Sequence, residues 1–215
     1  MGIPAYAERM EGVTGSAVRE LLKLTQQPDM ISFGGGLPSA DSFPIRDLQQ
    51  IIGDLIENMS PELLQYGETE GYMPLREEIV KYMATKDVSV TAQDVIITSG
   101  SQQGLDLVAK AFLNDGDKVV VESPTYMAAL QTFRMYGAEF IEVPSDSDGV
   151  IVEKLENILR TEKNIKLIYL VPSFQNPSGR SMSVERRKAT MEVIQKYDVV
   201  LIEDAPYEDL KYTNK

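Results

Sequence analysis

The spacing of apolar residues predicts three helices in the first part of the chain. At residues 45–59 apolar side chains recur every three or four positions, the period of one helix face, and Pro44 suits the first turn. The same spacing predicts a helix at residues 16–24, which Ser16 would cap, and another helix after Pro74. This last helix is expected to turn three apolar side chains inward: Leu75, Ile79 and Met83.

From residue 94 onward, short strands alternate with helices. Five apolar runs without polar alternation predict buried strands at residues 95–98, 118–122, 140–143, 166–171 and 199–203. Helical spacing predicts the connecting helices at residues 105–112, 124–136, 152–160 and 183–197. Because the strands are apolar on both faces, the pattern predicts an α/β fold, with a mostly parallel sheet that has helices on both faces. Ligands of such sheets bind beyond the carboxyl ends of the strands.

Composition and charge exclude several classes of function. The chain has 215 residues, of which 43% are apolar and 25% charged, as is typical of a globular protein. It has 33 acidic and 21 basic residues and a net charge of −12, which opposes binding to nucleic acid or to an anionic membrane. It contains neither Cys nor His, which removes disulfides, thiolate and Ser-His-Asp catalysis and the usual metal ligands.

No targeting or membrane-spanning segment is expected. The first ten residues lack a cationic segment followed by an apolar run, so they do not resemble a secretory signal. The longest apolar runs, at residues 167–171 and 199–202, are far shorter than the ~20 residues that cross a bilayer. We therefore expect a cytoplasmic protein.

The segment after the first predicted strand is able to bind an anion. Residues 98–104 read TSGSQQG, a turn of small residues that leads into a helix. The free N–H groups and the positive end of that helix favour phosphate. The segment lacks the Gly-Lys-Ser/Thr end of a P-loop and is not a GxGxxG dinucleotide turn. A plain helix cap explains this segment equally well.

Further features have both a functional and a structural interpretation. Asp204 follows the last predicted strand, where a carboxylate serves either a ligand site or a helix cap. Asn176 lies in a turn that is otherwise a solvated loop, and residues 34–36 are three glycines that form either a phosphate loop or a flexible bend. Packing alone explains Tyr126 and Tyr66. Taken one at a time, none of these features identifies a function.

In their order and spacing, these features resemble the large domain of fold-type I pyridoxal phosphate (PLP) aminotransferases. The resemblance covers essentially the whole chain and rests on six segments: residues 31–38 ISFGGGLP, 65–76 QYGETEGYMPLR, 98–105 TSGSQQGL, 122–126 ESPTY, 172–179 PSFQNPSG and 203–207 EDAPY. Residues 101–107, SQQGLDL, are most similar to one branch of the family. That branch contains 2-aminoadipate, kynurenine and aromatic aminotransferases and the effector domains of MocR-type regulators.

The resemblance assigns cofactor contacts to four residues. Ser101 and Gln102 would hold the cofactor phosphate, together with the N-terminus of the following helix. Tyr126 would stack on the pyridine ring. Asp204 would pair with the ring nitrogen and keep it protonated, so that the ring accepts electrons from the substrate.

The resemblance also implies contacts to the rest of the site and a partner subunit. Asn176 and Tyr207 would hydrogen-bond the phenolic oxygen of the ring, and together with Asp204 they form the expected catalytic set. Gly36, with Asn176, would let the substrate carboxylate approach. Tyr66 would reach the phosphate in the neighbouring subunit of a homodimer. The expected reaction moves an amino group from an L-amino acid to a 2-oxo acid.

The same resemblance implies that part of the enzyme lies outside this sequence. In the family, the Schiff-base lysine lies a few tens of residues beyond the aspartate that matches Asp204, and Lys211 and Lys215 are too close to match. The expected domains are an N-terminal arm with helices at residues 1–60 and a partial PLP-binding large domain at residues 61–215, with the C-terminal small domain absent. We expect the 215-residue chain alone to show neither transamination nor a lysine-dependent visible band with PLP.

The sheet is expected to be incomplete as well. The family's strand order places residues 95–98 beside a strand encoded after residue 215, so this strand would expose unpaired backbone, while the other four stay contiguous. The sequence is therefore interpreted as a truncated form, a fragment or a pseudo-enzyme.

Three alternative functions remain. A MocR-like effector domain would keep the PLP site without turnover, and a lyase or decarboxylase of the same fold would share the visible residues. A nucleotide-binding Rossmann protein is disfavoured, because the glycine fingerprint is missing.

Overall fold

The chain consists of two units, and each is described separately. The computed structural model describes the following residues: 5–10, 29, 31, 36 and 38–211. One unit combines Met1–Val13 with Thr98–Lys215, and the other is Thr14–Ile97. The helix predicted at residues 16–24 lies outside the described residues, and the domain boundary expected between residues 60 and 61 stays a prediction.

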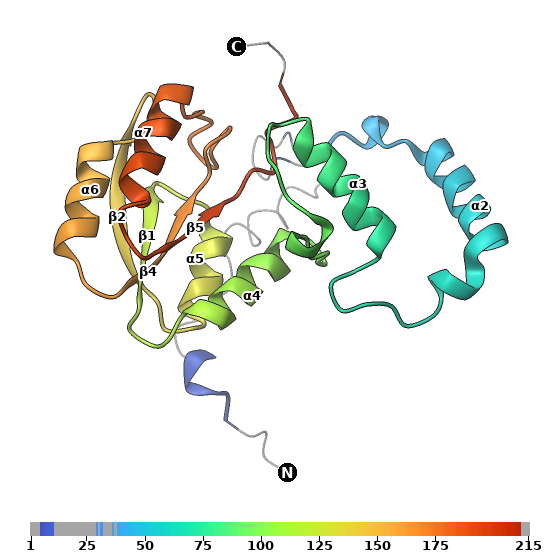
Figure 1. The fold of residues 1–215 in the computed structure, drawn as a ribbon, viewed down its shortest axis with the longest axis horizontal. Coiled ribbons are helices and arrows are strands. Elements are labelled where there is room, and N and C mark those ends of the chain that lie inside the picture. Colours follow the sequence, from blue (N-terminus) through green and yellow to red (C-terminus); the bar gives the residue numbers. More distant parts are fainter. Residues whose placement is uncertain (1–4, 11–28, 30, 32–35, 37, 212–215) are drawn as a thin grey trace. The chain divides into compact units, whose positions relative to one another are not determined.

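The unit that contains Thr98–Lys215 is built around a five-stranded sheet (Figure 1). Its strands are β1 (Lys118–Ser123), β2 (Glu139–Asp146), β3 (Gly149–Val150), β4 (Ile165–Leu170) and β5 (Val200–Glu203). They lie in the order β3-β2-β1-β4-β5. The β1–β2, β1–β4 and β4–β5 pairs are parallel, and the short β3 pairs antiparallel with β2. The predicted α/β fold with a mostly parallel sheet is confirmed, although β3 was not predicted.

Helices cover both faces of this sheet, as predicted. They are α4 (Ser101–Phe112), α5 (Met127–Arg134), α6 (Val152–Thr161) and α7 (Val184–Ile194). Figure 1 shows α6 and α7 on one side of the sheet and α4 and α5 on the other. Along β1, Val120 belongs to the apolar cluster of α6 and α7, whereas Val119 and Val121 belong to that of α4 and α5. Burial of one such valine contributes about 1.5–3 kcal/mol, which explains why this strand is apolar throughout.

The strand predicted at residues 95–98 does not form. Val95 has extended backbone angles, with φ −114° and ψ 129°, but the segment pairs with no strand among the described residues. The Ile97 N–H instead donates a hydrogen bond of 2.8 Å to the Glu70 carbonyl oxygen. Strand propensity alone does not make a strand, because a neighbouring ladder has to accept its backbone groups.

The helix predicted at residues 124–136 starts later than expected. It begins at Met127, and Tyr126 remains extended as its N-cap residue. It also ends earlier than expected, at Arg134, while Gly137 has the expected left-handed conformation, with a φ of +73° that favours glycine. Since a Cβ at Gly137 would lie 2.8 Å from Asp115 Cα, the turn leaves no room for a side chain.

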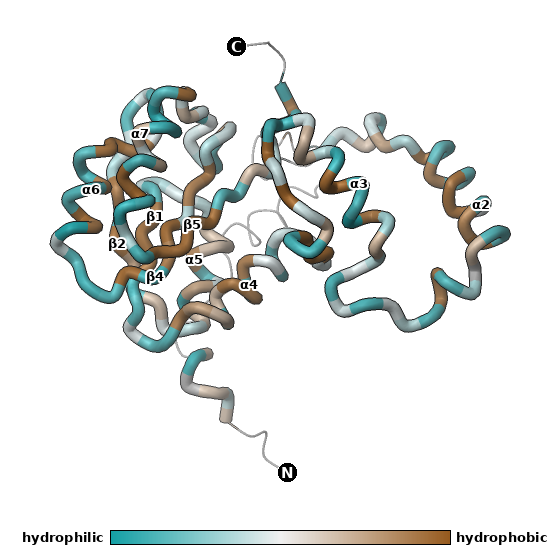
Figure 2. Tube along the Cα trace, viewed as in Figure 1, coloured by the Kyte–Doolittle hydropathy of each residue, from teal (hydrophilic) through white to brown (hydrophobic). Residues whose placement is uncertain are grey.

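The unit at Thr14–Ile97 contains two of the three helices predicted in the first part of the chain. Its helical elements are η2 (Ala40–Ser42), α2 (Ile45–Leu63), α3 (Met73–Ala84) and η3 (Ala92–Asp94). Helix α2 has a kink at Met59, with φ −131° and ψ 16°. Figure 2 shows that hydrophobic and hydrophilic positions alternate along α2, which agrees with its amphipathic pattern. On α3, Ile79 and Met83 are partly buried, whereas the expectation for Leu75 is wrong, since it is 46% exposed.

An arginine connects α3 to the 3₁₀ helix that follows it. Arg76 is 2% exposed, and its Nε and Nη2 donate hydrogen bonds of 2.9 and 2.5 Å to the Ala92 carbonyl oxygen. Its Nη1 lies 3.3 Å from Glu68 Oε2. The buried face that the apolar pattern assigns to α3 therefore includes a charged side chain whose donors are satisfied.

The sheet-containing unit also includes the short helix η1 (Glu8–Met10). Among the residues that the structure describes, no helix combines the length and the apolar character needed to cross a lipid bilayer.

Candidate functional site

A cavity lies at the carboxyl ends of β4 and β5, where the parallel sheet predicts a ligand site. Its volume is about 120 Å³, and eight residues line it: Ser101, Tyr126, Tyr169, Val171, Asn176, Asp204, Pro206 and Tyr207. Five of the eight residues that the sequence singled out are thus brought together from four separate segments. They are Ser101, Tyr126, Asn176, Asp204 and Tyr207.

Asp204 is held by both its backbone and its side chain. Its N–H donates a 2.9 Å hydrogen bond to the Leu170 carbonyl oxygen, which continues the β4–β5 ladder by one residue. Its carboxylate Oδ2 accepts a 2.7 Å hydrogen bond from the hydroxyl of Tyr169. The half-buried carboxylate therefore lies at a fixed point of the cavity wall.

Tyr169 is a buried donor on β4. Its side chain is fully buried, and its ring packs edge-on against Phe133, with 5.8 Å between ring centres. Burial, and then the hydrogen bond to Asp204, hold the pKa of Tyr169 well above the usual tyrosine value. The phenol consequently stays protonated and remains a donor to the carboxylate.

Ser101 is the first residue of α4, and its side chain lies beside the cavity. Gly100 precedes it with φ +80°, a left-handed conformation that a residue with a side chain adopts only with strain. The first N–H groups of a helix have no partner within the helix and carry its positive end, so this terminus is suited to an anion.

Gln102 is placed differently from the sequence expectation. Its side-chain amide donates a hydrogen bond to the hydroxyl of Thr132 on α5, and the residue is not among those that line the cavity. In this structure Gln102 ties α4 to α5, while its position in the first turn of α4 still contributes a backbone N–H to that terminus.

Gln175 joins the two loops that carry Tyr126 and Asn176. Its Nε2 donates a 2.6 Å hydrogen bond to the Pro124 carbonyl oxygen, two residues before Tyr126. Its Oε1 accepts a 2.8 Å hydrogen bond from the N–H of Ser178, two residues after Asn176. Because Gln175 is buried and bonded on both sides, it fixes these loops relative to each other.

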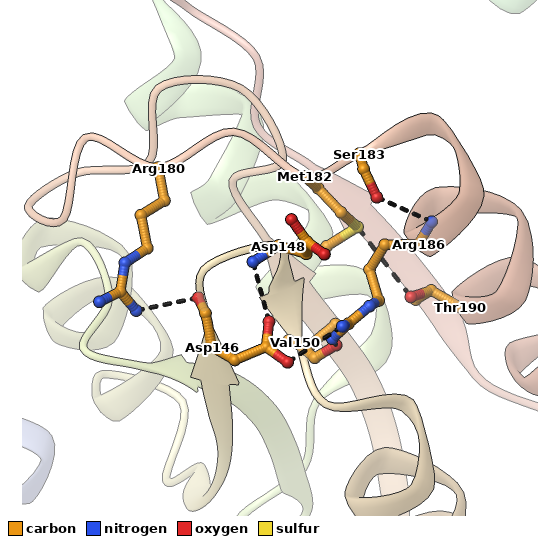
Figure 3. Close-up of polar contacts among 8 residues, drawn as sticks. All are labelled: Asp146, Asp148, Val150, Arg180, Met182, Ser183, Arg186 and Thr190. Carbon is orange, nitrogen blue, oxygen red and sulfur yellow. Dashed lines mark hydrogen bonds and ion pairs between the residues drawn. The ribbon is translucent and has the colours of Figure 1, made fainter.

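A second set of polar contacts fixes the far end of the loop that carries Asn176 (Figure 3). Arg180 Nη1 donates a 2.9 Å hydrogen bond to the Asp146 carbonyl oxygen at the end of β2. Arg186 on α7 lies 3.0 Å from Asp146 Oδ2 and donates a 2.6 Å hydrogen bond to the Val150 carbonyl oxygen on β3. The hydrogen bond from Arg186 lowers the pKa of Asp146, so this carboxylate stays charged. The short β3 hairpin thus serves to hold the loop.

Glu122 is a buried carboxyl group at the end of β1. It is 4% exposed, and its Oε2 accepts a 2.7 Å hydrogen bond from the N–H of Val171. Burial raises the pKa of Glu122 to about 7, and the hydrogen bond from Val171 opposes this shift. Glu122 lines a separate cavity of only about 10 Å³, which has room for little more than one water molecule.

Two predicted site residues, Gly36 and Tyr66, belong to the other unit, Thr14–Ile97. Gly36 has a φ of +56°, which favours glycine. Tyr66 is 99% exposed, and its N–H donates a 2.8 Å hydrogen bond to Gln65 Oε1. Their roles toward a substrate and a partner subunit stay predictions.

Sequence reasoning missed two residues that shape the site, Tyr169 and Gln175, and the buried carboxyl group of Glu122, which is bound to the Val171 N–H. Tyr169 lies in the apolar run of β4, where it was counted as core, although a tyrosine in a fully buried strand needs a partner for its hydroxyl. Glu122 directly follows the three valines of β1. Gln175 stands beside Asn176 in a segment whose composition indicates only a turn.

Comparison with known proteins shows to which proteins the chain is similar. Residues 28–215 match the family described as aminotransferase class I and II. The aromatic-amino-acid aminotransferase 1 of Thermococcus litoralis is 41% identical, over 98% of this chain and 52% of its own length. The 2-aminoadipate transaminase of Thermus thermophilus is 38% identical, over 97% of this chain and 51% of its own. This chain thus spans about half the length of these curated relatives.

Solved structures agree with the sequence relatives. The crystal structure of Pyrococcus horikoshii kynurenine aminotransferase, described in complex with PMP, is 43% identical to this chain. It superimposes with a TM-score of 0.90, over 98% of this chain and 53% of the other. The sheet with helices on both faces is therefore the large-domain fold of these aminotransferases.

Proposed function

Because the chain belongs to the class I and II aminotransferase family, we propose that it forms the PLP-binding part of an aminotransferase. The proposed reaction moves an amino group from an L-amino acid to a 2-oxo acid. The observation that carries the proposal is the cavity in which Asp204, Ser101 and Tyr126 come together. We further propose a cytoplasmic homodimer in which Tyr66 serves the partner subunit.

The residues that line the cavity match the chemical groups of PLP. The cofactor has a basic ring nitrogen, a phenolic oxygen, a flat aromatic face and a dianionic phosphate. The cavity offers a carboxylate at Asp204, an aromatic ring at Tyr126 and a helix N-terminus at Ser101. Asn176 and Tyr207 add an amide and a phenol, both of which are able to donate to an oxygen anion.

Each of these residues has a defined task in the proposed reaction. When bound, PLP supplies an electron-accepting ring. Asp204 holds a proton on the ring nitrogen, and Asn176 and Tyr207 stabilise the negative charge of the ring oxygen through hydrogen bonds. Ser101 and the N-terminus of α4 hold the phosphate, and Tyr126 fixes the plane of the ring. The hydrogen bonds of Gln175 keep the Tyr126 and Asn176 loops in register during these contacts.

The proposal is tested by the binding of pyridoxamine phosphate to the 215-residue chain. This probe carries an amine instead of an aldehyde, so its binding requires no covalent bond to a lysine. We expect Asp204→Asn to weaken binding by about ten-fold or more, because one charge-assisted hydrogen bond contributes about 1.5–3 kcal/mol. Calorimetric titration at neutral pH measures the dissociation constants.

Asp106→Asn is the matched control. Asp106 also accepts a hydrogen bond from a tyrosine, at 2.9 Å from Tyr136, but it lies outside the cavity. Its substitution is expected to leave the affinity unchanged. If Asp204→Asn and Asp106→Asn bind the probe equally well, the proposed cofactor site is wrong.

A further inference from the structure

Among the residues that the structure describes, the Asp204 carboxylate accepts a side-chain hydrogen bond at one oxygen only, which leaves the other oxygen for a ligand. Tyr169 donates to Oδ2 at 2.7 Å, and the backbone N–H of Asp204 is bound to Leu170 at 2.9 Å. Tyr169 lies on β4, and Asp204 directly follows the last residue of the neighbouring parallel strand β5, whose register pairs Tyr169 with Ile202. The contact is therefore set by the sheet itself rather than by a mobile loop.

The donor in this contact cannot easily turn away. The Tyr169 ring is fully buried, packs against Phe133 and belongs to the apolar cluster of α4 and α5. A buried hydroxyl without a partner is costly, so the tyrosine depends on Asp204 as much as Asp204 depends on the tyrosine. Such a pair has one favoured arrangement, in which the carboxylate has little freedom to rotate.

We propose that Tyr169 is a positioning residue, whose hydroxyl fixes the Asp204 carboxylate so that its second oxygen meets the protonated ring nitrogen of the cofactor. This inference rests on the proposed PLP site. The hydroxyl donates to Oδ2 from a fixed place on β4, so the carboxylate keeps one orientation. The other titratable groups that act on Tyr169 or line the cavity are Tyr126, Glu122 and Tyr207.

The test compares two probes that differ only at the ring nitrogen. Pyridoxamine phosphate presents the nitrogen, and its deaza analogue has a C–H group at the same position. We expect the unsubstituted 215-residue chain to bind pyridoxamine phosphate about ten-fold or more tightly than the analogue, as one hydrogen bond to a charged group implies. In Tyr169→Phe this ratio is expected to fall about five-fold or more, because the carboxylate is no longer held.

Two variants provide the controls. Tyr136→Phe removes a hydroxyl that also donates to a carboxylate, Asp106, but lies away from the cavity, and it is expected to keep the full ratio. In Asp204→Asn the two probes are expected to bind about equally, and adding Tyr169→Phe to this variant should change the ratio of their affinities no further. Circular dichroism confirms that each variant folds. If Tyr169→Phe does not fold, 3-fluorotyrosine placed at position 169 replaces it, since this stronger donor should keep or raise the ratio.

The outcomes separate the inference from the proposed function. If Tyr169→Phe weakens both probes equally, its role is only structural and the inference is overturned. The inference is also overturned if 3-fluorotyrosine at position 169 lowers the ratio of the two affinities. If the unsubstituted chain binds neither probe, or both equally, the proposed ring-nitrogen contact itself fails. A large ratio in the unsubstituted chain that Tyr169→Phe lowers selectively supports both.

Discussion

Glu122 is a carboxyl group whose ionisation opposes folding. Its pKa rises from 4.5 to about 7 on folding, because burial disfavours the charged form. Below pH 4.5 this carboxyl group is protonated in both the folded and the unfolded state, and its contribution to stability is fully present. As the pH rises to about 7, the unfolded state releases the proton first, so the folded state loses this stability. We expect the free energy of unfolding to lose about 3 kcal/mol from this group across that window.

Glu122→Gln tests this loss with little change in shape. The amide keeps an oxygen that can accept the Val171 N–H, but it does not ionise, so the variant should lack this part of the pH dependence and be more stable than the unsubstituted chain at pH 8. Urea denaturation at pH 4.5, 6 and 8 measures the difference. Glu142→Gln, on the neighbouring strand β2 and exposed, is the control and should change little. Equal pH dependence with and without the Glu122 carboxyl contradicts the prediction.

At the level of single residues, sequence reasoning predicted residues that line the cavity, but it did not predict the hydrogen bonds between them. Asp204, Asn176 and Tyr126 were recognised because each follows a predicted strand or matches a family segment. Tyr169 was not, since a tyrosine within an apolar strand is counted as core unless the partner of its hydroxyl is known. That partner lies 35 residues away in the sequence, and only the β4–β5 register brings the two together.

Between elements, Arg76 is the contact that the apolar pattern does not reveal. Lysine at this position keeps the charge but lacks the planar fork that gives the Ala92 carbonyl two donors. We expect Arg76→Lys to lower the free energy of unfolding of the unit Thr14–Ile97 by about 1–3 kcal/mol. Hydrogen exchange of the amides around η3 measures it, with Arg46→Lys on the exposed face of α2 as the control. If hydrogen exchange is unchanged in Arg76→Lys, the paired hydrogen bonds from Arg76 to Ala92 do not stabilise this unit.

Elements with a long or strongly apolar pattern were predicted, whereas the prediction failed where an element depends on whether one particular neighbour is present. Apolar residues recur with helical spacing along α2 and form continuous runs in β1 and β4, so the sequence is sufficient to predict whether each is a helix or a strand. The segment at residues 95–98 has the same β-branched character, but it forms no strand because the described residues provide no ladder beside it. Conversely, β3 has two residues, too few for a periodic signal, and exists through its pairing with β2.

For the whole molecule, the net charge of −12 bears on the proposed homodimer. Two copies of such a chain repel each other through solvent, and this repulsion opposes association at any interface that does not neutralise it. Salt screens the repulsion, because the Debye length falls from about 30 Å at 0.01 M to about 10 Å at 0.1 M ionic strength. The dimer is therefore expected to become tighter as salt increases.

Sedimentation equilibrium at these two ionic strengths tests this expectation. We predict that the dimer dissociation constant decreases several-fold from 0.01 to 0.1 M sodium chloride, because the added salt screens the repulsion between two copies of the same net charge. An uncharged osmolyte at matched osmolality should leave the constant unchanged, which separates screening from a general effect of solute. A dimer that weakens with salt contradicts the prediction, since ion pairs between the copies would then outweigh the repulsion.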